Sequence, residues 1–188
     1  MKIYHERNDT MTTRTLPRTG EKRTSKLKYQ ILTGLMAAMI TLMTAYLCHI
    51  PTGINGGYIH LGDAVIYLAA ALLPTPYALA AAAIGGGLAD LLTAPLWLPA
   101  TIVIKMLIAL PFTCKSAKII TPRNIAAAVI ACAVTVIGYF AAEYLIFGTW
   151  AALAASISGN LIQSGGSAVV FIIIGLALDK TRLKTKLI

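Results

Sequence analysis

Charged residues are scarce in this chain: 12% of its 188 residues are charged, 57% are hydrophobic, and the mean hydropathy is +0.75. Soluble domains carry about 25% charged residues and about 45–50% apolar residues. The scarcity of charge excludes an ordinary soluble domain, and the hydrophobicity excludes a disordered chain. We interpret the sequence as a polytopic membrane protein, because one small core would not bury this much apolar surface in water.

Several chemical signatures are missing as well. The sequence has no Walker A motif, so we expect the chain itself to hydrolyse no nucleotide. It has no HExxH and no GxSxG sequence, which are common signatures of membrane hydrolases. Its cysteines, at positions 48, 114 and 132, lack the CxxC spacing of metal sites. We therefore expect no catalytic residue, no metal, no cofactor in this chain and no enzymatic activity.

The apolar residues form six segments, which predict an all-α membrane protein with six transmembrane helices. A straight span needs about 20 apolar residues. The second and third segments are shorter, but Pro74 and Pro76 separate them into two helices. Four or five spans are the competing count. The segments are residues 27–50, 59–73, 77–92, 97–114, 125–147 and 158–178.

Basic residues predict the orientation of these helices. The 16 Lys and Arg residues outnumber the 7 Asp and Glu residues and gather in residues 1–26, in the link 115–123 and after residue 179. The other links carry none, and six spans place all the basic stretches on one side. The positive-inside rule then puts both termini in the cytoplasm. Residues 1–26 and 180–188 are predicted to be basic tails, the first disordered, around a membrane domain at 27–179. Because the positive charges lie between apolar runs, nucleic acid is not an expected partner.

Polar residues of the predicted spans gather in the outer half of the membrane. Asn160 and Gln163 share a helix face at i,i+3, and Glu143 lies at a matching depth. These amides and this carboxylate form a donor and acceptor set for a polar ring, on which Tyr139 could stack. Lys105 lies deeper, about 12 Å along its helix. Its ammonium must pair, snorkel or face water, and its candidate partners are Asp63, Asp90 and Glu143.

Three further features have two interpretations each. The glycine-rich link 51–58 could cover an outward cavity or form a simple turn. Trp97 could cap that cavity or belong to the aromatic belt at the membrane surface. Small residues at four-residue spacing in the first helix, Gly34 with Ala38 and Ala37 with Thr41, could serve internal packing or a partner protein.

Four short stretches occur in order along the chain: GGYIHLGDA at 56–64, AD at 89–90, PATIVIK at 99–105 and GNLIQ at 159–163. Together they resemble the substrate-binding S components of energy-coupling factor (ECF) vitamin transporters. The similarity is greatest to the group of hydroxymethylpyrimidine and pyridoxine carriers. It covers about residues 28–178 and leaves the N-terminal tail outside.

The resemblance implies a substrate-binding protein in the cytoplasmic membrane of a prokaryote. It would bind a vitamin or vitamin precursor from outside and topple inward against a transmembrane coupling protein. Two cytoplasmic ATPases would supply the energy from ATP. In such families the first helix contacts the coupling protein, here through Gly34, Ala37, Ala38 and Thr41. The pocket lies at the link after the first helix and at helices four to six.

The residues and the resemblance together give two expected sets. The substrate-binding set is Asn55, Tyr58, His60, Trp97, Lys105, Tyr139, Glu143, Asn160 and Gln163. The structural ion-pair set is Asp63, Asp90 and Lys105. The alternative function is an autonomous proton-coupled permease with Asp63, Asp90 and Glu143 as proton sites. An intramembrane enzyme with a His60–Asp63 acid–base pair is a weaker alternative, because no nucleophile accompanies that pair.

Overall fold

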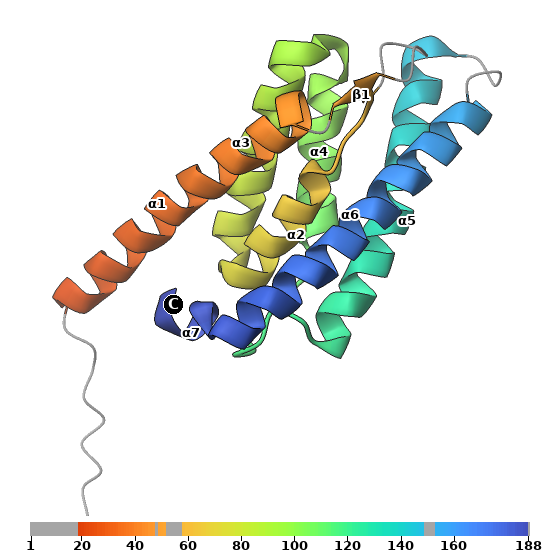
Figure 1. The fold of residues 1–188 in the computed structure, drawn as a ribbon. Coiled ribbons are helices and arrows are strands. Elements are labelled where there is room, and N and C mark those ends of the chain that lie inside the picture. The colour runs from red at the N-terminus through yellow and green to blue at the C-terminus, as the bar shows by residue number, and fades with distance from the viewer. Residues whose placement is uncertain (1–18, 48, 52–57, 149–152, 188) are drawn as a thin grey trace, which may run out of the picture.

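The computed structural model describes residues 19–47, 49–51, 58–148 and 153–187. These residues form a helical bundle with one short β-hairpin (Figure 1). The helices are α1 (Thr19–Leu42, continued by a π-helix at Met43–Leu47), α2 (Gly62–Leu72), α3 (Thr75–Thr93), α4 (Leu98–Ala109, preceded by a 3-10 turn at Pro95–Trp97), α5 (Pro122–Phe147), α6 (Leu153–Thr181) and α7 (Leu183–Leu187). The strands β1 (Ile50–Pro51) and β2 (Tyr58–Ile59) pair antiparallel.

Each apolar segment of the sequence contains a helix. Among the described residues, four helical stretches are long and apolar enough to cross a membrane, and the stretches Gly62–Leu72 and Pro95–Ala109 are apolar but shorter. The outer surface carries large apolar side chains such as Leu145, which is 82% exposed. A continuous apolar exterior of this kind suits lipid and not water. The number of spans and the side on which the termini lie stay predictions.

The structure describes parts of both predicted basic tails as helical, and the tail boundaries stay predictions. Helix α1 begins at Thr19, so residues 19–26 are helical, while residues 1–18 lie outside the described part. Glu21, Lys22 and Lys26 are good helix formers that extend the apolar helix toward its N-terminus. At the other terminus α6 continues to Thr181, and α7 follows after a left-handed residue at position 182.

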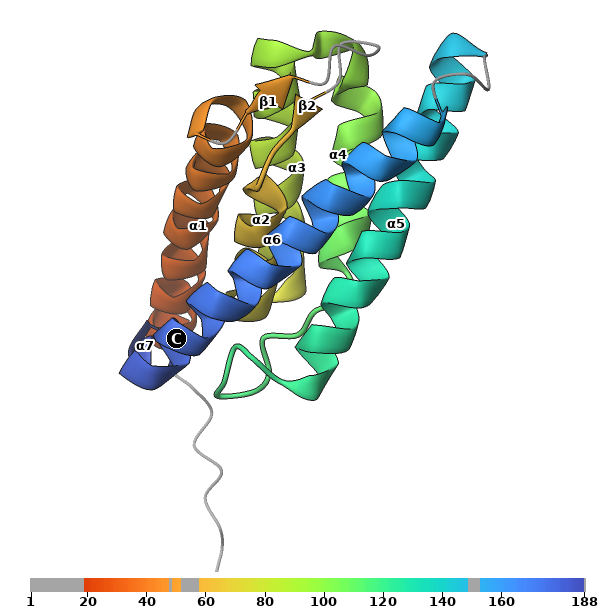
Figure 2. The ribbon, with the colours of Figure 1, turned by 45° about the vertical axis from the view of Figure 1, so that its right-hand side comes forward.

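The two ends of the bundle differ in what they carry. Helices α1 and α5 begin at one end, where α7 also lies, and we call it the terminal end (Figure 1). The strands β1 and β2 and the connection from α3 to α4 lie at the opposite end, the hairpin end (Figure 2). Helices α2, α4 and α6 all run toward the terminal end, and the first turn of α2 lies beside the interior of α4 and α6.

The core is built around α2, in which every residue is buried. This helix packs against α1, α3, α4 and α6. The ring of Tyr67 stacks on Phe112 at 5.0 Å between centroids and meets Phe171 edge-on at 5.9 Å. A helix that is apolar all round is stable only when neighbours cover all its faces. The short α2 is therefore an internal element that fixes the helices carrying the polar side chains.

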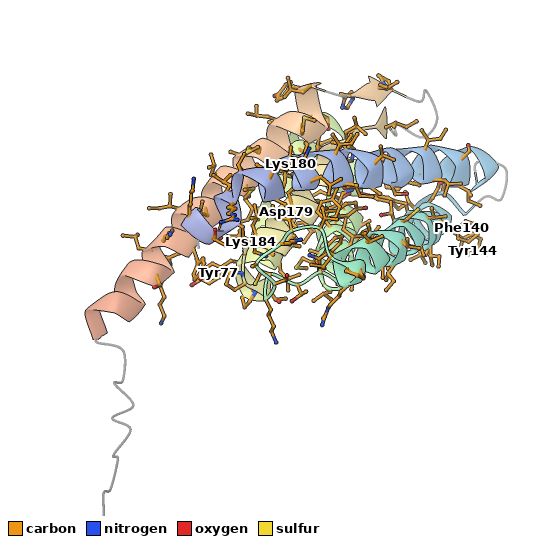
Figure 3. The ribbon with its side chains drawn as sticks, turned by 60° about the horizontal axis from the view of Figure 1, so that its bottom comes forward. Tyr77, Phe140, Tyr144, Asp179, Lys180 and Lys184 are labelled. Atoms are coloured by element: carbon orange, nitrogen blue, oxygen red, sulfur yellow. The ribbon has the colours of Figure 1, made fainter. Side chains whose placement is uncertain are left out.

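Polar contacts connect helices and links at the terminal end. The side-chain oxygens of Asp179 on α6 accept hydrogen bonds from the backbone of Ile119 at 2.7 Å and of Ile120 at 2.9 Å, in the link before α5. The ammonium of Lys184 on α7 donates to the carbonyl of Ala71 at 2.8 Å, near the end of α2. Burial lowers the pKa of Lys184 from its ordinary value. Figure 3 shows Asp179 and Lys184 at this end, far along the bundle from Tyr144 of α5.

Candidate functional site

A buried polar network joins three helices near the hairpin end. Asp63, in the first turn of α2, accepts a hydrogen bond from the ammonium of Lys105 on α4 at 2.5 Å. Its second oxygen accepts one from the side-chain amide of Gln163 on α6 at 3.1 Å. The amide oxygen of Gln163 accepts from the backbone of His60 at 3.3 Å. All four residues are buried, so the network ties α2, α4 and α6 together at one depth.

The Lys105–Asp63 pair neutralises both charges inside the protein. A lysine in a membrane span costs about 2.5–3.5 kcal/mol on insertion scales. Here the ammonium has a carboxylate at contact distance, and the carboxylate has a partner on each oxygen. Asp90, the other expected member of this set, is also buried, on α3. The pair can therefore position the surrounding helices without offering a bare charge to a ligand.

The ring of His60 is held in one tautomer. Its Nδ1 accepts a hydrogen bond from the backbone N–H of Gly62 at 3.0 Å. A ring nitrogen that accepts carries no proton, so the N–H of a neutral His60 is at Nε2. Gly62 is required here, because the side chain of Thr44 from the π-helix fills the place where a Cβ would lie. Sequence reasoning missed Gly62 and Thr44, although the glycine stands inside the GGYIHLGDA stretch.

Three aromatic rings lie together on one face of α5 near the hairpin end. Trp97, from the turn before α4, contacts Tyr139 and Phe147 of α5, each at 6.0 Å between centroids. We call these three rings the aromatic box. Glu143 lies one helical turn from Tyr139 and one turn from Phe147, on the same face, and is 3% exposed. Along α5, Glu143 therefore lies between the two box residues Tyr139 and Phe147.

Tyr139 joins the aromatic box to the polar network. Its hydroxyl lies 2.9 Å from the hydroxyl of Thr101 on α4. The ammonium of Lys105 lies 5.3 Å from the centroid of its ring, within the range of a cation–π interaction. These two contacts fix the ring, so Tyr139 presents a rigid face. Thr101 and Phe147 were missed in the sequence, because neither carries a charge or an amide that marks it as polar.

The remaining expected site residues are placed only in part. Asn160 is half-buried on α6, one turn before Gln163. Tyr58 pairs with Pro51 through the strands, but its side chain lies outside the described residues, as does the whole of Asn55. Contacts thus connect five of the expected substrate-binding residues, directly or through Asp63, and Glu143 shares a face of α5 with one of them. The five are His60, Trp97, Lys105, Tyr139 and Gln163.

The small residues of α1 divide between two faces. Ala37 is buried, and Thr41 donates to its carbonyl at 3.0 Å and to that of Gly85 on α3 at 3.1 Å. A Cβ at Gly85 would lie 2.6 Å from that of Ile40, so the glycine permits the close crossing of α1 and α3. Gly34 and Ala38 are exposed. Ala37 and Thr41 thus serve internal packing, and Gly34 and Ala38 are open to contact.

An apolar groove of about 590 Å³ lies between α5 and α6, lined by residues of 125–137 and 161–172. Its lining suits lipid chains more than a polar ring. Within the described ranges, no three His, Cys, Asp or Glu side chains lie together as metal ligands would.

Comparison with known proteins identifies a family. No curated protein matches the sequence. The sequence model of the family described as "ECF-type riboflavin transporter, S component" matches residues 25–180. The match supports the resemblance to S components and leaves the pyridoxine and hydroxymethylpyrimidine group a prediction. It covers most of the chain, from the start of the apolar part of α1 to the end of α6. This multi-pass membrane protein therefore belongs to the ECF-type riboflavin transporter S component family, a family of transport subunits and not of enzymes.

Proposed function

We propose that this chain is the substrate-binding subunit of an ECF-type importer in the cytoplasmic membrane of a prokaryote. Its substrate is a small vitamin or vitamin precursor with a heteroaromatic ring, similar to pyridoxine or hydroxymethylpyrimidine. The observation that carries the proposal is the aromatic box beside the network of His60, Asp63, Lys105 and Gln163. Flat rings stack on such aromatic faces, and the nearby amides and imidazole can bond ring substituents.

The charges of the links support an outward-facing pocket. Exposed basic residues, among them Lys115, Lys118, Arg123 and Lys180, lie at the terminal end. The links at the hairpin end contain no Lys or Arg. By the positive-inside rule the hairpin end faces outside and both termini face the cytoplasm, with α2 and α4 completing six spans. The substrate then enters the protein from outside the cell.

Delivery requires partners in this proposal. The exposed Gly34 and Ala38 of α1 form a smooth surface on which a helix of the transmembrane coupling protein can pack closely. Two cytoplasmic ATPases bound to that protein hydrolyse ATP, and the S component topples to release its substrate inward. The chain itself binds no nucleotide in this scheme, which agrees with its lack of a Walker A sequence.

The autonomous permease is the competing function. A proton site must exchange its proton during each cycle. Asp63 is a poor candidate, because its oxygens bond Lys105 and Gln163. Uptake into vesicles that contain only this chain, abolished by an uncoupler, would favour the permease.

Ligand titration tests the proposal. The purified chain in lipid nanodiscs is titrated with pyridoxine, hydroxymethylpyrimidine and riboflavin, the last because the matching family model is described by it. We expect saturable binding of one of these or of a close analogue. A folded chain that binds no vitamin or precursor would contradict the proposed function.

A further inference from the structure

The apolar groove between α5 and α6 has no part in the proposed substrate site. It has a volume of about 590 Å³, and its walls are almost entirely apolar. Val129, Ile137 and Leu161 line the groove and are exposed, so it opens to the surroundings of the bundle. Small residues line its middle, and these are Ala128, Cys132, Ala133, Gly165 and Ala168.

The polar atoms beside the groove are bonded to one another. The sulfur of Cys132 lies 2.9 Å from the hydroxyl of Ser164, which donates to the carbonyl of Asn160 at 2.7 Å. At Gly165 no atom lies within 4 Å of the place that a Cβ would take, so the glycine leaves space open. The groove therefore offers a ligand apolar contact and room.

The length of the groove matches one leaflet of a bilayer. Its lining on α5 runs from Ile125 to Ile137, about 18 Å at a rise of about 1.5 Å per residue. Half of a hydrocarbon core about 30 Å thick is about 15 Å. Because α5 begins at Pro122 and ends at Phe147, the groove follows the half of this helix nearer the terminal end. It thus has the length and position for one acyl chain of the leaflet at that end.

Cations lie where the groove reaches the terminal end. Asp179 of α6 accepts hydrogen bonds from two backbone N–H groups of the link before α5, so this link lies against the end of α6. Lys118 precedes that contact in the link, Lys180 follows it on α6, and Arg123 lies in the first turn of α5. All three are exposed, and Figure 3 shows Lys180 beside Asp179 at this end. Such basic residues attract the head groups of anionic lipids.

We infer that the groove binds an acyl chain of an anionic phospholipid from the leaflet at the terminal end, with the phosphate beside Lys118, Arg123 and Lys180. The apolar walls match the chain, and the cations match the head group. An apolar helix of another protein would match the walls alone. The inference goes beyond the proposed function and does not depend on which vitamin binds.

Two lipids that differ only in the head group provide the test. Phosphatidylglycerol and phosphatidylcholine with identical acyl chains are added to the purified full chain in detergent. Native mass spectrometry then measures which lipid the chain retains. We expect one retained lipid per chain, with phosphatidylglycerol preferred about fivefold for each cation that its phosphate contacts.

The variant Gly165→Phe tests the groove. Its ring enters open space, so the variant should fold and should retain both lipids about tenfold less or weaker still. The matched control is Ile173→Phe, which places the same ring at an exposed position of α6 outside the groove and should change retention by less than about twofold. If Gly165→Phe does not fold, Ala133→Phe at an exposed lining position of α5 replaces it.

The double variant Lys118→Gln with Arg123→Gln tests the head group. It should lower the preference for phosphatidylglycerol about tenfold or more, while phosphatidylcholine is retained as before. The matched control is Lys26→Gln with Lys28→Gln, two exposed positions on α1. Figures 1 and 2 show α1 across the bundle from α5, so this control should keep the preference.

Three outcomes would overturn the inference. The first is equal retention of the two lipids by the unmodified chain, and the second is full retention by a folded Gly165→Phe variant. The third is a dimer whose subunits retain no lipid, which would assign the groove to a second copy of the chain. Vitamin binding is measured separately, so each of these results leaves the proposed function standing.

Discussion

The ammonium of Lys105 lies 2.5 Å from the carboxylate of Asp63, and both side chains are buried where α2 and α4 meet. The second carboxylate oxygen binds Gln163 of α6, so one acidic side chain joins three helices. The two contacts of Asp63 hold the buried polar network next to the aromatic box. We therefore expect loss of the Lys105–Asp63 pair to lower the stability of the fold, and not only to remove one contact with a ligand.

Replacing Asp63 alone should be strongly destabilising. Asp63→Asn leaves the ammonium of Lys105 buried without its counter-charge, which typically costs about 3–5 kcal/mol. The double variant Asp63→Asn with Lys105→Met removes both charges and should recover part of that loss. Thermal unfolding of the detergent-purified variants measures the difference. Equal melting temperatures for the single and the double variant would contradict a pair that acts as one unit.

Gly62 should tolerate no side chain while Thr44 is present. Gly62→Ala places a methyl group where the Thr44 side chain lies, and overpacking of this kind costs about 1–3 kcal/mol. Thr44→Ala makes room, so the double variant should be more stable than the sum of the single changes predicts. Melting temperatures of the four proteins test the coupling. Strict additivity would show that the two residues do not meet.

The Tyr67→Phe variant should be more stable than the unmodified chain. Its hydroxyl is buried and has no hydrogen-bond partner among the described residues, which costs roughly 1–3 kcal/mol. Tyr67→Phe keeps the stacking on Phe112 and the edge contact with Phe171. We expect a higher melting temperature than that of the unmodified chain. Tyr144→Phe, on the exposed face of α5, is the control and should change little; a lower melting temperature for Tyr67→Phe would show that the hydroxyl is bonded.

Ala38 should matter for transport and not for substrate binding. Ala38→Trp places a large ring on the exposed face of α1, where we propose that the coupling protein packs. Substrate affinity of the isolated chain should stay within about twofold, while uptake with the coupling protein and ATPases is lost. Leu145→Trp, at an exposed position of α5, is the control for bulk in the membrane. Normal uptake by Ala38→Trp would place the coupling surface elsewhere.

The helices could be predicted from the sequence because apolar runs and prolines are local signals. Pro74 separates α2 from α3 as expected, and the apolar run at 125–147 lies within α5. The partner of Lys105 could not be predicted, because three carboxyl groups lay at compatible depths and only the packing of α2 on α4 selects Asp63. Basic residues after position 179 indicated a tail, but Lys184 bonds the end of α2, a contact between residues distant in the sequence.

The charged and amide side chains of the candidate site were predicted from the sequence. The residues that hold neighbouring side chains in place were not. Glu143 and Gln163 stand out in an apolar helix, so composition alone marks them. Thr101 and Phe147 do not stand out, and their roles follow only from the contacts with Tyr139 and Trp97. The π-helix that carries Thr44 was also not predicted from the sequence.

The most direct test of the account is a ligand titration of the purified chain beside its Trp97→Ala variant, with Leu145→Ala as the control. Trp97 contacts both other rings of the aromatic box, so its loss should weaken vitamin binding about tenfold or more. The control should bind as the unmodified chain does. Unchanged affinity in a folded Trp97→Ala variant would contradict a substrate site at the hairpin end.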